Sequence, residues 1–317
     1  MDTVTLTIER HARPSLRARA LARGMRALLR PAIGRASAGP IDYAKAASFD
    51  KMAARFRPPR GTHVKPVRLD GFGAEWVHGP GVGRSREKVV LYFHGGGWIS
   101  CGLNTHRRMI ARLSAAAGVP AFSVDYRMLP EVTFNEEVLD CVAAYEHLLG
   151  SGIPASNIVV AGDSAGGYMA FASTLLIRDA GLPLPAAIIA LSPMLDMDLE
   201  AKLAHANSRL DPTNVMPVLQ NFVKEILADL DAKDPAISPI YADLAGLPPC
   251  YMSAGTTEIL ACDAEIMAER LAAAGVPCTL QLWDDQLHVF QMFGSALPES
   301  RAAIADFGRW VTASLPA

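Results

Sequence analysis

Residues 158–167 read IVVAGDSAGG, in which four apolar residues lead into a turn rich in glycine. The apolar run is typical of a strand that is buried on both faces of a parallel sheet. The residues after it, 165–179, are rich in alanine and leucine and predict a helix. Ser164 therefore lies at a strand-to-helix turn, inside a Gly-x-Ser-x-Gly pentapeptide. The pentapeptide alone also fits a plain connecting turn, but in this context it is typical of a nucleophile elbow.

The geometry of this turn explains why serine and glycine occur in it. A tight turn pushes the Ser164 hydroxyl out of the sheet at the cost of backbone strain. The flanking glycines leave room where neighbouring strands approach the turn closely. The helix that begins after Ser164 directs its amide groups and positive dipole end toward the place where negative charge develops in an acyl transfer. The turn thus predicts a serine nucleophile.

A second glycine-rich turn follows another apolar run, because residues 89–98 read VVLYFHGGGW. A serine that attacks a carbonyl group creates an oxyanion, which needs N–H donors in fixed positions. Consecutive glycines let backbone N–H groups face that oxygen without side chains in the way. We expect the donors to be Gly96, Gly97 and Ala165, and we expect His94 and Gly95 to support the loop.

A base and an acid complete such a site, and both follow the serine in the chain, with the acid first. Two histidines come after Ser164, namely His205 and His288. His205 falls in a stretch expected to be helical, whereas His288 follows the apolar residues 279–283, which predict a late strand. His288 is therefore the predicted base.

Two carboxylates are candidates for the acid, since Glu258 and Asp263 both follow the expected strand 250–254. Glu258 lies closer to the end of that strand, where it can orient the imidazole of His288. Asp263 falls in the first turn of the next helix, where an acidic residue commonly stabilises the helix dipole. We predict Glu258 as the acid, with Asp263 as the alternative.

The rest of the chain alternates between expected strands and helices, which predicts an α/β fold with a mainly parallel sheet covered by helices on both faces. The apolar runs indicate eight strands, at 64–69, 74–77, 89–93, 120–125, 157–161, 186–191, 250–254 and 279–283. An amphipathic helix over 15–30 is ended by Pro31 and Gly34, and a second helix covers 43–55. A stretch interrupted by prolines, 196–245, is mostly helical.

The amino-acid composition favours a globular protein and argues against some functional classes. The chain has 30 basic and 32 acidic residues, a net charge of −2 and a hydrophobic fraction of 50%, as globular chains have. Residues 1–60 carry 13 Lys or Arg against 4 Asp or Glu, while the remainder carries 17 against 28. The near-neutral total argues against a dedicated nucleic-acid-binding protein.

Targeting and cofactor signals are missing from the sequence. No run of about 18 apolar residues occurs, and the N-terminal residues lead us to expect no secretory leader. The five cysteines are scattered without a CxxC pair, and no dinucleotide or P-loop fingerprint occurs. We expect a cytoplasmic protein with free thiols, no metal and no organic cofactor.

These motifs together resemble the hormone-sensitive-lipase-like esterases, the bacterial family IV carboxylesterases of the α/β-hydrolase fold. The resemblance runs from about residue 69 to 310. Residues 125–131, DYRMLPE, are similar to the DYRLAPE segment of that family, in which we expect Arg127 and Glu131 to form an ion pair. Residues 258–260, EIL, stand where most members have an aspartate motif, a variant that a subset of members use.

The resemblance implies a cap of two pieces over the active site. The first piece covers residues 1–55 and the second covers 197–245, while 56–196 and 246–317 form the hydrolase core. Apolar residues expected to line the substrate pocket are Trp98, Met25, Met216 and Phe222.

The function that follows is a serine carboxylesterase with Ser164, His288 and Glu258 acting on short-to-medium acyl esters or lactones. An amidase or peptidase with the same machinery is the first alternative. A ligand-binding protein without activity is the second, which the presence of His288 and Glu258 opposes. The partners implied are a small-molecule substrate and a second copy of the chain in a homodimer, whereas nucleic acid and membrane contact are not expected.

Overall fold

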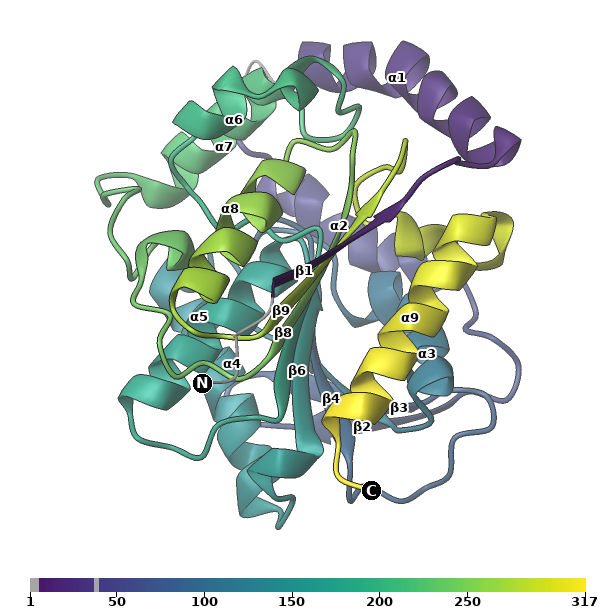
Figure 1. Ribbon diagram of the computed structural model, residues 1–317, viewed down its shortest axis with the longest axis vertical. Helices are drawn as coiled ribbons and strands as arrows, with labels where there is room; N and C mark the ends of the chain where they lie inside the picture. Colours follow the sequence, from purple (N-terminus) through teal and green to yellow (C-terminus); the bar gives the residue numbers. More distant parts are fainter. Residues whose placement is uncertain (1–5, 37–39) are drawn as a thin grey trace.

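The structure is a computed structural model that describes residues 6–36 and 40–317 (Figure 1). Its described part contains one sheet of nine strands. The strands are β1 (Leu6–His11), β2 (His63–Arg68), β3 (Gly73–His78), β4 (Val89–Phe93), β5 (Ala121–Asp125), β6 (Ile158–Asp163), β7 (Ala187–Leu191), β8 (Cys250–Gly255) and β9 (Cys278–Trp283).

The order of the strands across the sheet is β1-β9-β8-β7-β6-β4-β5-β3-β2. Strand β3 runs antiparallel to both of its neighbours, β2 and β5. Every other pairing is parallel. The carboxyl ends of β4, β6, β8 and β9 therefore point to the same edge, and the candidate residues predicted from the sequence follow these four strands.

Strand β1 corrects the expected number of strands from eight to nine. It pairs in parallel with β9, from Leu6 opposite Cys278 to His11 opposite Trp283. The side chains between its two half-buried end residues are exposed. An edge strand held by backbone pairing leaves no apolar run in the sequence, so the pattern analysis missed it. Residues 6–11 thus join the sheet, although they fall in the range expected for the cap.

Helices cover both faces of the sheet (Figure 1). Helices α4, α5 and α8 lie on one face, and α3 and α9 lie side by side on the other. The α-helices are α1 (Leu16–Ala36), α2 (Tyr43–Ala53), α3 (Leu103–Ala117), α4 (Phe134–Gly150), α5 (Ala165–Asp179), α6 (Glu200–Ala204), α7 (Met216–Leu227), α8 (Ala261–Ala273) and α9 (Pro298–Ser314). The 3₁₀ segments are η1 (Ala155–Asn157), η2 (Ala206–Arg209), η3 (Pro239–Tyr241) and η4 (Phe290–Ala296).

The central strands are buried on both faces, as their continuous apolar runs predict. In β4, Val89, Leu91 and Phe93 pack into the core on the α4 and α5 side. Val90 and Tyr92 point to the opposite face and pack against α3 and α9. This double burial fixes the register of the strand, because a shift by one residue would exchange the two sets of side chains.

Helices α1, α6 and α7 lie together at the edge of the molecule to which the carboxyl ends of the parallel strands point (Figure 1). Helix α1 is fixed there by two arginines, since Arg26 donates to the carbonyl of Leu210 and Arg30 to that of Arg209. The helix does not end at Pro31 as expected but continues to Ala36. Contacts on both sides of Pro31 support the extra turn. Before the proline, Arg30 donates to the carbonyl of Arg209, and after it Gly34 lies close to Val215.

Candidate active site

Ser164 occupies the strained turn between β6 and α5. Its backbone has φ of 54° and ψ of −119°, in the left-handed half of the map that residues with side chains rarely adopt. Close contacts explain the flanking glycines: a Cβ on Gly162 would lie 2.1 Å from the carbonyl oxygen of Gly166, and one on Gly166 would lie 2.0 Å from that of Phe93. The turn predicted from the sequence is thus present with its strain.

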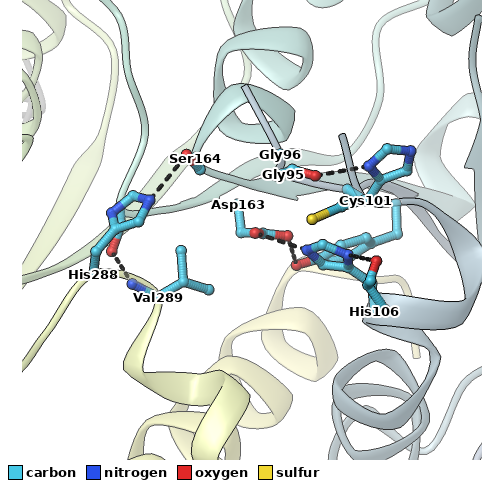
Figure 2. A network of polar contacts seen from close by, with 12 residues as sticks. Gly95, Gly96, Cys101, His106, Asp163, Ser164, His288 and Val289 are labelled. Carbon is cyan, nitrogen blue, oxygen red and sulfur yellow. Dashed lines mark hydrogen bonds and ion pairs between the residues drawn. The ribbon is translucent and has the colours of Figure 1, made fainter. Parts of the chain in front are cut away.

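A chain of hydrogen bonds runs from Ser164 through His288 to Glu258. The Ser164 hydroxyl lies 2.9 Å from Nε2 of His288, whose Nδ1 lies 2.6 Å from Oε2 of Glu258. Figure 2 shows the imidazole of His288 next to Ser164. With Nδ1–H donating to the carboxylate, Nε2 is free to accept the serine proton.

Glu258 is completely buried and held from a second direction. Its Oε1 accepts hydrogen bonds from the hydroxyl of Ser192, at 2.7 Å, and from the backbone N–H of Gly255, at 2.6 Å. The Ser192 hydroxyl also accepts a hydrogen bond from the N–H of Val289, next to His288. Ser192 therefore ties both residues to the end of β7, a role that no local sequence signal indicated.

Asp263, the alternative acid, makes other contacts. Its Oδ1 lies 2.7 Å from Nζ of Lys202, and both side chains are buried. Its Oδ2 accepts hydrogen bonds from the N–H groups of Leu195 and Asp196. These contacts engage both oxygens of Asp263 between α6 and the segment after β7, and neither reaches His288.

The environment of His288 acts on its pKa in opposite directions. Burial lowers the pKa, because the charged imidazolium loses hydration. The hydrogen bond and the charge of Glu258 raise it, and Asp211 adds to that effect. The sum raises the pKa of His288 above its ordinary value of 6.5. Glu258 thus stabilises the protonated imidazole.

The loop after β4 brings three glycines to Ser164. Gly95, Gly96 and Gly97 line the same cavity as Ser164 and His288. Gly96 has φ of 132° and Gly97 of 63°, and a Cβ on Gly95 would lie 2.4 Å from Oδ2 of Asp163. Glycine is thus required at all three positions. Ala165 is the first residue of α5, whose N-terminal N–H groups are free of intrahelical partners.

His94 is buried under this loop. Its Nδ1–H donates to the carbonyl of Gly95 at 2.8 Å, and its ring stacks on Tyr126 with 4.5 Å between centroids. The Tyr126 hydroxyl donates to the carbonyl of His94. Burial, followed by the charge of His106, lowers the pKa of His94 to about 4. A neutral ring clamped on both sides holds the loop in place.

A buried ion pair lies on the other side of the elbow (Figure 2). Nε2 of His106 lies 3.2 Å from Oδ2 of Asp163, whose Oδ1 accepts a hydrogen bond from the Tyr92 hydroxyl. Burial alone would raise the pKa of Asp163, but His106 and Tyr92 hold it below its usual value. Because Asp163 precedes Ser164 directly, this pair connects α3 to the elbow. The sequence analysis assigned no role to His106.

A cavity of about 460 Å³ opens above Ser164. Two of the four predicted pocket residues, Trp98 and Phe222, line it. Met216 is buried in the core instead, and Met25 is half-buried on α1; neither lines the cavity. Phe222 comes from α7 and packs onto the glycine loop so closely that a Cβ on Gly97 would lie 2.7 Å from its Cζ.

The segment before α7 is bonded to the loop that carries Glu258. The side-chain amide of Asn207 donates to the carbonyls of Thr256 and Glu258, at 2.8 Å each. Oδ2 of Asp211 accepts a hydrogen bond from the N–H of Ile259 at 2.9 Å. Both side chains are buried. Asp211 also accepts hydrogen bonds from the N–H groups of Thr213 and Asn214. The sequence around it therefore indicates a local turn, but not the contact with the loop after β8.

Neither a metal centre nor a membrane span is found in the described ranges 6–36 and 40–317. No group of three or more His, Cys, Asp or Glu side chains there is arranged to hold a metal ion. No described helix combines the length and the apolar character that crossing a bilayer requires.

The DYRMLPE segment behind the site differs from the expectation. Arg127 does not pair with Glu131 but with Asp140 of α4, at 2.6 Å. Both oxygens of Asp140 are used, since Oδ2 accepts from the backbone N–H and from Nε of Arg127. Asp140 thus meets the planar guanidinium of Arg127 with both of its oxygens, a geometry that strengthens such a pair.

Comparisons with known proteins identify the fold family and related enzymes. A family model described as alpha/beta hydrolase fold matches residues 90–292. The chain is 35% identical over 269 residues to "Esterase LipU" of Mycobacterium tuberculosis, covering 82% of this chain and 90% of the relative. Its fold is similar to a crystal structure of EstE5 soaked with p-nitrophenyl butyrate, with a TM-score of 0.86 and 33% sequence identity. That match covers 95% of this chain and 99% of the EstE5 chain. It is equally similar to the crystal structure of an esterase from the bacterial hormone-sensitive lipase family, with a TM-score of 0.86 and 33% sequence identity. That match covers 96% of this chain and 100% of the esterase chain.

Proposed function

Because this chain belongs to the alpha/beta-hydrolase-fold family, in which its relatives are esterases, we propose that it is a serine carboxylesterase that uses Ser164, His288 and Glu258. The observation that carries the proposal is the hydrogen-bond chain from the Ser164 hydroxyl through His288 to the buried Glu258, next to a loop of three glycines. This is the arrangement that nucleophilic catalysis by serine needs.

The first half of the reaction forms an acyl-enzyme. Oγ of Ser164 attacks the ester carbonyl carbon while Nε2 of His288 takes its proton. The carbonyl oxygen becomes an oxyanion, which the N–H groups of Gly96, Gly97 and Ala165 stabilise. The bond to the alcohol oxygen then breaks, and His288 returns the proton to the leaving alcohol.

The second half releases the acid. His288 takes a proton from water, which attacks the acyl carbon and forms a second oxyanion at the same donors. The bond to Oγ breaks, and His288 gives the proton back to Ser164. Glu258 keeps the Nδ1–H tautomer and stabilises the imidazolium in both halves.

The cavity suits esters with short-to-medium acyl groups, or lactones. Its volume is about 460 Å³, and Trp98 and Phe222 form an apolar wall beside the glycine loop. Phe222 comes from α7, so this end of the cavity is closed by the segment 197–245, which we propose acts together with α1 as the cap. A long acyl chain would have to displace that wall.

A substrate panel tests the proposal. Wild-type protein is expected to hydrolyse p-nitrophenyl butyrate much faster than the matching butyryl anilide, and Ser164→Ala is expected to lose at least about 10³-fold in kcat. Ser173→Ala is the matched control, because that hydroxyl lies on α5, the helix that follows Ser164, and donates to the carbonyl of Met169. Faster turnover of the anilide would favour an amidase, and unchanged hydrolysis by Ser164→Ala would rule out the mechanism.

A further inference from the structure

A second cavity, of about 610 Å³, lies between α3, η4 and α9. It shares no lining residue with the cavity above Ser164. Four arginines line it: Arg57 after α2, Arg108 and Arg112 on α3, and Arg301 on α9. We call it the arginine cavity. Segments distant in the sequence thus bring four positive charges to one hollow.

The arginine cavity has no counter-charge in its wall, since no Asp or Glu is among its described lining residues. The contrast with Arg107 on the same helix is direct, because Arg107 pairs with Glu75 through two hydrogen bonds of 2.8 and 2.7 Å. The nearby carboxylate of Asp50 bonds to Asn104 and Thr105 at the start of α3. Like charges gathered without an acidic partner repel one another, and a bound anion would offset that repulsion.

Arg112 is held in place inside the cavity. Its guanidinium donates to the carbonyl of Arg108, one helical turn earlier, at 3.1 Å. The backbone of η4 packs against it, so that a Cβ on Gly294 would lie 2.6 Å from its Cζ. Burial, followed by the charge of Arg108, lowers the pKa of Arg112.

A groove of about 510 Å³ continues from the arginine cavity and shares Arg108, Arg112 and Ser295 with it. The remaining wall of this groove is largely apolar, with Phe56, Met109 and Phe293. A ligand with an anionic group and an apolar part fits this combination.

We propose that the arginine cavity binds the phosphate group of a small molecule or lipid, with Arg108 and Arg112 as its central ligands. Guanidinium groups bind phosphate oxygens through pairs of charge-assisted hydrogen bonds, which suits a cluster without carboxylates. The shared chemistry is the phosphate, whether it is free in solution or part of a lipid headgroup.

Calorimetric titration with inorganic phosphate at low ionic strength tests the proposal, together with sedimentation with vesicles of phosphatidylglycerol or phosphatidylcholine. The variant is Arg108→Gln with Arg112→Gln. The matched control is Arg19→Gln with Arg23→Gln, which removes the same charge at the same spacing from the exposed face of α1. Hydrolysis of a neutral ester and circular dichroism verify that both variants fold.

The expected result is that wild-type and control proteins bind phosphate, and that the cavity variant binds at least about tenfold more weakly. Binding to phosphatidylglycerol vesicles alone, lost in the cavity variant and kept in the control, would support the same site with a lipid headgroup as its source. No binding of either probe by the wild-type protein, or equal losses in both variants, would overturn the proposal. Because the readout is binding, it is independent of ester hydrolysis.

Discussion

The protonation state of His288 sets the pH dependence of the proposed reaction, because only the neutral imidazole can take the serine proton. The structure raises the pKa of His288 above 6.5 through Glu258. We therefore expect kcat/KM for a neutral ester to rise with pH through a limb that lies above 6.5. Replacing Glu258 by Gln removes the charge that raises this pKa, so the limb should move to lower pH while the plateau falls.

The pH–rate profile of Asp263→Asn is the comparison, since Asp263 does not touch His288. Its limb should stay where the wild-type limb lies. A limb that moves in Asp263→Asn and not in Glu258→Gln would assign the acid to Asp263.

For single residues, the sequence was most informative where the catalytic group and the backbone turn that holds it lie within a few consecutive residues. The elbow around Ser164 needs glycines and a serine within one turn, so the pattern is local. Glu258 and Asp263 follow the same strand, and only their contacts in three dimensions separate them: one meets His288, the other Lys202. Ser192 acts from the end of a different strand, so no spacing pointed to it.

Among the elements, the segment between α6 and α7 does more than cover the cavity. Asn207 is bonded to two carbonyls of the loop that carries Glu258, and Arg30 of α1 donates to the carbonyls of Ser208 and Arg209 on the same segment. A continuous set of hydrogen bonds thus connects the N-terminal helix to the proposed acid. Asn207 is a positioning residue in this account.

Replacing Asn207 by Ala should lower kcat about tenfold or more with little change in KM, because Glu258 loses its support and a small displacement of such a group is costly. Steady-state kinetics on p-nitrophenyl butyrate measure kcat and KM separately. The control is Asn135→Ala, an exposed asparagine at the start of α4. A change in KM alone would mean that the segment only contacts substrate.

Under the proposed function, Phe222 of α7 limits the length of the acyl chain. Truncation to Ala removes the ring packed on Gly97, so the ratio of kcat/KM for a decanoyl ester to that for a butyryl ester should rise about tenfold. The same ratio in Phe49→Ala, which removes an exposed ring from α2, should not change. An unchanged ratio in Phe222→Ala would place the chain-length limit elsewhere.

Element boundaries were predictable only where side chains are buried. The central strands have continuous apolar runs and were found, whereas β1 is held by backbone pairing to β9 and was missed. Helix α1 passes Pro31 because tertiary contacts outweigh the local penalty of proline. Both errors arise from contacts with residues far away in the sequence.

At the scale of the whole molecule, the basic first 60 residues do not simply attract the acidic remainder. Arg26 and Arg30 donate to backbone carbonyls, and Arg57 joins the other arginines in the arginine cavity. An ion pair between the two parts, Arg10 with Asp284, is exposed. Exposed ion pairs contribute little to stability. Specific hydrogen bonds, rather than attraction between net charges, therefore hold the N-terminal part against the core.

The buried pair Lys202–Asp263 connects α6 to α8 and should matter for stability. Replacing Lys202 by Met leaves a buried carboxylate without its partner, which should lower the free energy of unfolding by about 3–5 kcal/mol. Urea denaturation measures the loss, and Lys224→Met, an exposed lysine on α7, is the control. A loss of less than about 1 kcal/mol would show that the pair is weakly coupled to folding.

The central claim is that Ser164 is the nucleophile, and covalent labelling tests it most directly. The protein is incubated with diethyl p-nitrophenyl phosphate, which phosphorylates activated serines, and peptide mass spectrometry locates the adduct. We predict a single diethylphosphoryl group on Ser164, loss of ester hydrolysis in step with labelling, and no label in Ser164→Ala. A label on another residue, or full labelling of Ser164→Ala, would contradict the account.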